Sequence, residues 1–174
     1  MQSIDVANYL IAKYGNKIRL TNLSINKLVY YCQVESLRLL GRPLFVDRIE
    51  AWEYGPVEPA VYHAFKGYGR STIHKPAMPG GTSDIPNAEE ATVIDSAMKK
   101  YGDLTAYDLV ELSHRKGGAW SNKFDRSNDI EITTNDIVSS DDYKSEPDLS
   151  NTFLANVESI EKEWRNTIRI LGDA

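Results

Sequence analysis

The segment from Leu23 to Leu40 constrains the fold most, because its apolar residues occupy more than one side of a helix. One stripe holds Ile25, Leu28, Val29, Cys32, Leu39 and Leu40, and another holds Tyr30, Val34 and Leu37. A helix that is apolar on several sides is buried against several neighbours. Gly41 and then Pro43 supply stop signals. We therefore predict a central helix that ends at Leu40.

Capping residues and apolar spacing predict further helices along most of the chain. They begin near Ser3, Pro56 or Pro59, Asn87, Thr105, Ala119, Thr134 and Ser150. The last is an amphipathic helix of about residues 150–171. Its apolar face contains Phe153, Val157, Ile160, Trp164, Ile168 and Leu171, and we expect that face to dock on another surface.

The helical period is lost between Leu44 and Tyr54, where Ile49 and Ala51 alternate with larger polar and aromatic residues. This pattern favours an extended segment, which Gly55-Pro56 then ends. Ile130 and Ile132 can form another brief strand, and residues 72–86 read as a long loop. The predicted fold is mainly α: a single compact helical domain over residues 1–174, with a small β element around residues 44–54.

Composition narrows the class of protein. The 174 residues fit one domain. The 20 Lys and Arg against 25 Asp and Glu give a net charge of -5, which is unfavourable for binding the phosphate backbone of a nucleic acid. We find no apolar run that could span a membrane and no signal-peptide pattern at the start. The single cysteine excludes an intrachain disulfide. We expect a cytoplasmic protein.

No motif for catalysis or metal binding emerges. The histidines are His63, His74 and His114, and their spacing matches no metal signature, so a structural or surface role is favoured about three to one for each. Phosphate-binding glycine motifs are absent, and Cys32 belongs to the core stripe. We predict no catalytic residue, no metal and no cofactor. An enzyme would require His63, His114 and Glu58 to converge in one pocket.

Aromatic residues are the most prominent feature of the middle of the chain. They include Tyr30, Tyr31, Trp52, Tyr54, Tyr62, Phe65 and Tyr68. Aromatic side chains build both hydrophobic cores and the energetic centres of protein interfaces. Core packing is favoured about two to one for any single residue.

Several strings read together resemble a known family. They are Leu28-Val29-Tyr30-Tyr31-Cys32-Gln33, Gly41-Arg42-Pro43-Leu44-Phe45, Ala51-Trp52-Glu53-Tyr54-Gly55-Pro56-Val57, Phe65-Lys66-Gly67-Tyr68-Gly69, and Leu112-Ser113-His114 followed by Trp120. In this order they resemble the Panacea domain of SocA-like and GepA-like antitoxins of bacteria and their mobile elements. The resemblance implies a mainly helical antitoxin, encoded beside a protein toxin that it neutralises by direct binding. In one branch it implies an adaptor that delivers the toxin to a ClpXP-type protease.

The resemblance also suggests roles for residues. We assign a structural role to Tyr30, Trp52, Gly55, Pro56, His114 and Trp120, with a tight turn at Gly55-Pro56 and Trp52 in the core. We expect Tyr54, Glu58, His63 and Lys66 to be partly exposed and to bind the partner. An acidic antitoxin can be steered onto a basic toxin. An adaptor would also need a dock for a ClpX-type unfoldase, for which the C-terminal helix or Ser139 to Asp148 is the candidate.

Overall fold

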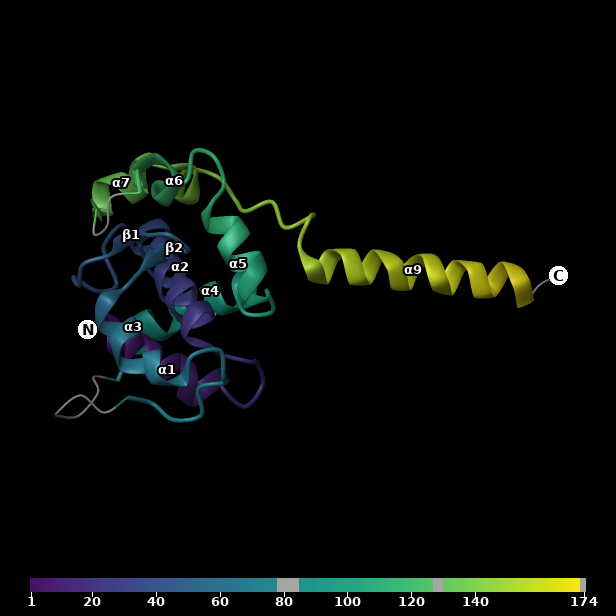
Figure 1. Ribbon diagram of the computed structural model, residues 1–174, viewed down its shortest axis with the longest axis horizontal. Coiled ribbons are helices and arrows are strands. Elements are labelled where there is room, and N and C mark those ends of the chain that lie inside the picture. Colours follow the sequence, from purple (N-terminus) through teal and green to yellow (C-terminus); the bar gives the residue numbers. More distant parts are fainter. Residues whose placement is uncertain (78–84, 127–129, 173–174) are drawn as a thin grey trace.

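Helix α2, Asn22–Leu40, runs through the middle of the molecule, as predicted (Figure 1). The computed structural model describes residues 1–77, 85–126 and 130–172. Around α2 lie α1 (Ser3–Tyr14), α3 (Pro59–Phe65), α4 (Ala88–Tyr101) and α5 (Ala106–Ser113), all of which contact it. The mainly α fold class is confirmed.

Local sequence explains where α2 begins and ends. The Thr21 side chain accepts a hydrogen bond from the Ser24 amide, and Gly41 adopts the left-handed conformation with φ of 66° after the last turn. Cys32, Leu28 and Tyr30 are buried as the double stripe predicts, whereas Leu39 of the same stripe is 55% exposed. The burial extends to polar side chains on the same helix, among them Asn22, Asn26, Lys27, Gln33 and Glu35. Each of these buried polar groups must find a partner inside the molecule.

The small β element is confirmed, although only Glu50–Trp52 of the extended segment predicted over residues 44–54 forms a strand. Strands β1 (Glu50–Trp52), β2 (Gly55–Val57) and β3 (Ile130–Glu131) form an antiparallel sheet in the order β2-β1-β3. We expected Gly55-Pro56 to end the extended segment, and this was wrong: Trp52 pairs with Gly55, so the chain turns at Glu53 and Tyr54 and continues as β2. Pro56 is tolerated because β2 is an edge strand.

Short helices complete the body. They are η1 (Lys66–Tyr68), α6 (Ala119–Lys123), α7 (Thr134–Ser139) and α8 (Asp141–Lys144). The predicted caps at Asn87 and Thr105 are confirmed, whereas Thr133 and not Thr134 caps α7. The long loop predicted over residues 72–86 lies partly outside the described residues. Among the described helices, none combines the length and apolar character that a membrane crossing requires.

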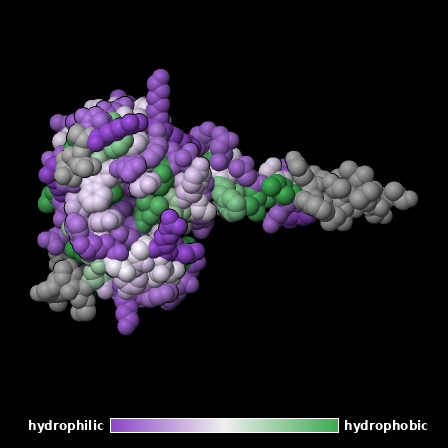
Figure 2. Space-filling view, in the orientation of Figure 1, coloured by the Kyte–Doolittle hydropathy of each residue, from purple (hydrophilic) through white to green (hydrophobic). Residues whose placement is uncertain are grey.

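Helix α9, Phe153–Gly172, leaves the body and projects away from it (Figure 1). Our expectation that its apolar face docks on the body is not met where the structure describes that face: Phe153 is 61% exposed and Ile160 is 55% exposed. Figure 2 shows apolar residues at the start of the projecting segment. The helix begins after Thr152, whose carbonyl accepts from the Asn156 amide, and not at the predicted Ser150.

Candidate functional site

A buried lysine joins α2 to the β1–β2 hairpin. Lys27 Nζ donates a hydrogen bond to the Pro56 carbonyl at 2.8 Å. Gly55 has a φ of +102°, and a Cβ atom there would lie 2.5 Å from Ser113 Oγ and 2.7 Å from Lys27 Cε. Only glycine satisfies both the backbone conformation and the space. The hairpin, α2 and α5 therefore meet at one point, Gly55.

A tryptophan holds the other strand of the hairpin. Trp120 Nε1 on α6 donates to the Trp52 carbonyl at 2.7 Å. The Trp120 ring stacks on His114 with centroids 3.8 Å apart, and on Phe124 at 4.7 Å. Residues that are distant in the sequence, Trp52, His114 and Trp120, are thus brought together around the hairpin.

Tyr30 lies in a different part of the core. Its hydroxyl donates to Asp142 Oδ2 at 2.6 Å, and the Ala119 amide donates to the same oxygen at 2.8 Å. Burial, and then the nearby Asp142 carboxylate, raise the pKa of Tyr30 well above its ordinary value. Tyr30 therefore joins α2 to α6 and α8 as a neutral hydrogen-bond donor.

A cleft of about 560 Å³ opens beside the hairpin. It is lined by Asn22, Leu23, Asn26, Lys27, Trp52, Glu53, Tyr54, Val57, Tyr62, Lys66, Gly69 and Arg70. Trp52 forms part of its wall and is only half-buried, so our placement of Trp52 in the core was wrong. Its ring packs edge-on against Tyr62 at 4.8 Å, and its Nε1 donates to Glu50 Oε2. Such a concave surface, with aromatic walls and a few polar groups, is typical of binding sites.

Two of the four expected partner-binding residues line this cleft. Tyr54, at the hairpin turn, is 61% exposed, and Lys66, at the end of α3, is exposed. His63 is exposed on α3 but does not line the cleft, and its ring lies 5.3 Å from that of Tyr62. Tyr54 and Lys66 are therefore available to a partner from within the cleft, and His63 from beside it.

Glu58 departs from our expectation, because it is completely buried. Its backbone amide donates to Asn26 Oδ1 at 3.1 Å, which fixes the chain where β2 turns into α3. Neither carboxyl oxygen makes a hydrogen bond of ordinary geometry with the described residues. Burial, and then the negative charge of Asp47, raise the pKa of Glu58 to about 9. Glu58 is therefore protonated at neutral pH and unable to contact a partner.

Lys27 is a second buried ionisable group with an unusual environment. It is completely buried, and no described carboxylate lies within ion-pair distance of it. Burial lowers the pKa of Lys27 to about 7. The lysine that lines the cleft is therefore close to its titration point at neutral pH.

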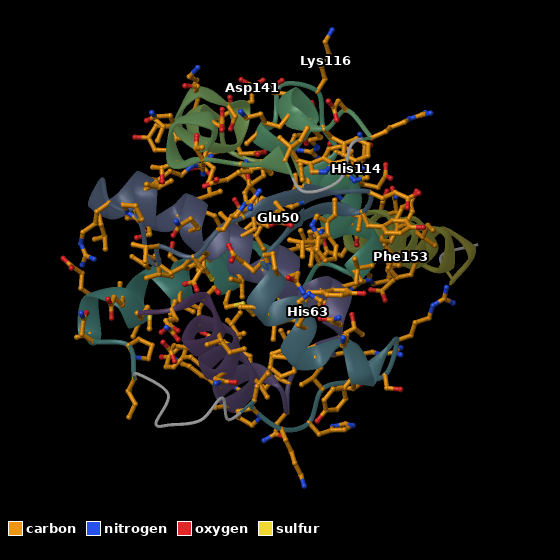
Figure 3. All side chains as sticks on the ribbon, turned by 60° about the vertical axis from the view of Figure 1, so that its left-hand side comes forward. Glu50, His63, His114, Lys116, Asp141 and Phe153 are labelled. Carbon is orange, nitrogen blue, oxygen red and sulfur yellow. The ribbon has the colours of Figure 1, made fainter. Side chains whose placement is uncertain are left out.

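The arrangement does not support the enzymatic alternative. His63 lies on α3, His114 at the end of α5, and Figure 3 shows them apart. Burial, and then the charge of Lys27, lower the pKa of the half-buried His114, and Glu58 is enclosed elsewhere. None of the three lines the cleft. Within the described residues there is also no group of three or more His, Cys, Asp or Glu placed to hold a metal ion.

Sequence reasoning missed several residues that shape the cleft: Asn22, Asn26, Lys27, Tyr62 and Arg70. A signal for the first three was present. Asn22 and Asn26 lie four residues apart and Lys27 follows directly, on a helix whose several faces are apolar, so their polar groups had to be buried together with it. Tyr62 stood out only as one of several aromatic residues in the middle of the chain, and Arg70 carried no comparable signal.

The sequence matches to known proteins include the part of the chain that forms the hairpin and most of α2. A family model described as antitoxin SocA-like, Panacea domain, matches residues 25–121. Antitoxin SocA of Caulobacter vibrioides (strain NA1000 / CB15N) is 33% identical over 136 residues, which make up 68% of this chain and 70% of that protein. No solved structure matches. The matched segment contains α2 from Ile25 onward, the hairpin, Trp120 and every cleft residue except Asn22 and Leu23, and the chain belongs to the SocA-like antitoxin family with a Panacea domain.

Proposed function

We propose that this protein is an antitoxin that neutralises a cognate protein toxin, encoded by an adjacent gene, by binding it directly through the cleft and the hairpin turn. The observation that carries the proposal is Tyr54. It is a largely exposed aromatic side chain on a turn whose two strands are held by Lys27 and Trp120. Rigid exposed aromatics are preferred as energetic centres of interfaces, because little conformational entropy is lost when they bind.

The experiment is co-expression with the product of the adjacent gene, scored by growth rescue and by co-purification. Tyr54→Ala is expected to weaken binding by at least about 2 kcal/mol, as truncation of a central aromatic does. Leu39→Ala is the control, because Leu39 is an apolar side chain that is 55% exposed on α2 and does not line the cleft. Circular dichroism establishes that both variants are folded. Equal rescue and equal binding by the two variants would place the interface elsewhere.

Delivery of the toxin to a ClpXP-type protease is the alternative, and it needs a second docking surface. Of the two candidate docking surfaces, we favour α9, which projects from the body, over the Ser139 to Asp148 segment. That segment is packed, since Arg38 donates to the carbonyls of Asp142, Tyr143 and Ser145. Under direct inhibition, toxin abundance in cells is unchanged by the antitoxin, whereas an adaptor lowers it only when the protease is present.

A further inference from the structure

The cleft continues into a second one, and together they form a groove across the surface. The second cleft, of about 860 Å³, is lined by Ile18, Arg19, Thr21, Leu23, Gly69, Arg70, Gly102, Asp103, Leu104, Thr105, Ala106 and Tyr107. Leu23, Gly69 and Arg70 line both. We call the two clefts together the basic groove.

The charge of the groove lining has the opposite sign to the net charge of the chain. Its lining carries the cations Arg19, Lys27, Lys66 and Arg70 against the carboxylates Glu53 and Asp103, although the whole chain has a net charge of -5. None of these four cations forms an ion pair with a described residue. The expectation that an acidic antitoxin meets a basic toxin therefore does not describe this surface, which complements an anion.

Exposed apolar side chains accompany the cations. Leu23 is 38% exposed at the junction of the two clefts, Tyr54 is 61% exposed at one end, and Tyr107 is 71% exposed on the α5 side. Apolar surface exposed beside unpaired charge is what an interface needs: the apolar part provides affinity and the charges provide orientation.

We propose that the basic groove binds a segment of the partner protein in which an acidic side chain, placed against Lys66 and Arg70, is accompanied by apolar residues that cover Leu23 and Tyr107. This inference rests on the proposed function, because it names the chemistry that the same surface recognises. No described residue provides a counter-charge for the buried Lys27, and the carboxylate of the partner supplies it.

Binding of such a carboxylate is coupled to the protonation of Lys27. Burial lowers the pKa of Lys27 to about 7 in the free protein, and a nearby anion favours the charged form. The groups beside Lys27 are the Pro56 carbonyl on β2 and Ser113 and His114 on α5, and the charged residues Glu53 and Lys66 line the same cleft. Of these, His114 is neutral above pH 7 because its pKa is lowered, so Lys27 is the group that changes between pH 7 and 8.5.

The first test identifies the contact chemically. The probe is the purified complex with the full-length product of the adjacent gene, treated with a zero-length carbodiimide that joins amines to carboxylates in ion-pair contact. Mass spectrometry is expected to find Lys66 joined to an Asp or Glu side chain of the partner. Lys66→Arg keeps the charge and the binding but loses the crosslink. A crosslink from Lys66 to the partner's terminal carboxylate, to a second copy of this chain, or to nothing in an intact complex would overturn the proposal.

The second test measures affinity. The double variant Lys66→Glu/Arg70→Glu is expected to raise Kd at least about tenfold at 0.1 M salt and to reduce the salt dependence of binding. Lys75→Glu/Lys99→Glu is the control of equal charge change, because both lysines are exposed and line neither cleft. If the double variant binds within about twofold of wild type, the proposed antitoxin function stands and this inference fails. If wild type does not bind the partner, both fail.

The third test uses pH. Between pH 7 and 8.5 the wild-type Kd is expected to rise about tenfold, since binding then requires uptake of a proton. Lys27→Met, checked for folding by circular dichroism, removes this rise. Glu58, whose pKa is about 9, is present in both proteins, and its effect cancels in the comparison. An equal rise in both proteins would contradict the coupling to Lys27.

Discussion

The β1–β2 hairpin and helix α9 are attached to the body in different ways. The hairpin is held on one strand by Lys27 and on the other by Trp120, through side chains from α2 and α6. Helix α9 is attached at its first residue, where the Phe153 amide donates to Asp108 Oδ1, and its described side chains beyond that point face solvent or lie half-buried. The family match covers the hairpin and ends before α9. We therefore expect stability to be concentrated in the shared region and α9 to be an extension that can change without loss of the fold.

The largest effect is expected at the meeting point of the hairpin with α2 and α5. Gly55→Ala should destabilise the protein by about 4 kcal/mol, because a positive φ and a steric clash each contribute roughly 1–3 kcal/mol. Chemical denaturation measures the change. Gly67→Ala is the control, since a Cβ atom there meets nothing within 4 Å. Similar midpoints for the two variants would show that the hairpin is not fixed at Gly55.

Glu58 should make stability fall as pH rises. The pKa is about 9 in the folded state against 4.5 for an ordinary glutamate, so the folded state binds the proton more tightly. The contribution of Glu58 to the free energy of unfolding is therefore complete below pH 4.5. It is lost as pH rises towards 9, by at most about 1.4 kcal/mol per pH unit. Wild type should lose about 3 kcal/mol relative to Glu58→Gln between pH 6 and 8. Parallel unfolding curves for the two proteins over this range would contradict a buried, protonated Glu58.

Lys27 should make stability rise with pH, the opposite of the effect of Glu58. Its pKa falls to about 7 on folding, so the folded state binds the proton less tightly than the unfolded state does. Wild-type stability from this group is complete above the ordinary lysine value of about 10.4 and is lost as pH falls towards 7. Lys27→Met should flatten this part of the profile. An unchanged profile in the variant would mean that Lys27 reaches solvent.

A smaller effect is expected from the second attachment of the hairpin. Trp120→Phe keeps the stacking on His114 but leaves the Trp52 carbonyl without its donor, which should cost about 1–2 kcal/mol. Trp52→Phe is the comparison, because the Glu50 carboxylate that it leaves behind is still paired with Arg48. Thermal unfolding of both variants gives the difference, and a larger loss for Trp52→Phe would reverse our ranking of the two bonds.

The smallest effect is expected for α9. A chain that ends at Thr152 should unfold within about 0.5 kcal/mol of the full chain, since surface segments that bury little contribute little. The measurement is the same denaturation experiment. A loss of several kcal/mol would mean that α9 packs on the body in solution, which would remove the contrast with the hairpin.

The sequence was most informative where the signal is local. Asn87 with Glu90, and Thr105 with Asp108, predicted two helix starts because a capping box is made by residues three apart. The central helix was predicted because its several apolar faces can be read without knowing the neighbours. Tyr54 and Lys66 were predicted to be exposed, as they are.

The errors concern residues whose environment is made by distant segments. Glu58 follows a proline-containing strand and carries a charge, both typical of the surface, yet it is enclosed beside Asn26 and Asp47. Trp52 has the size of a core residue but lies at the edge of a cleft whose other walls come from α2 and α3. The helix pattern could indicate that Lys27 is buried but not what it contacts, because its Nζ donates to a carbonyl 29 residues away.

The buried position of Cys32 makes its thiol useful as a reporter of unfolding. Its thiol is fully buried in the middle of α2, and burial, followed by the charge of Glu35, raises its pKa. A thiol in this state is protonated and shielded, so it cannot be alkylated while the protein is folded. The rate at which an alkylating reagent modifies Cys32 therefore reports global opening, with no engineered label, and a cysteine introduced elsewhere can be labelled selectively in the native protein.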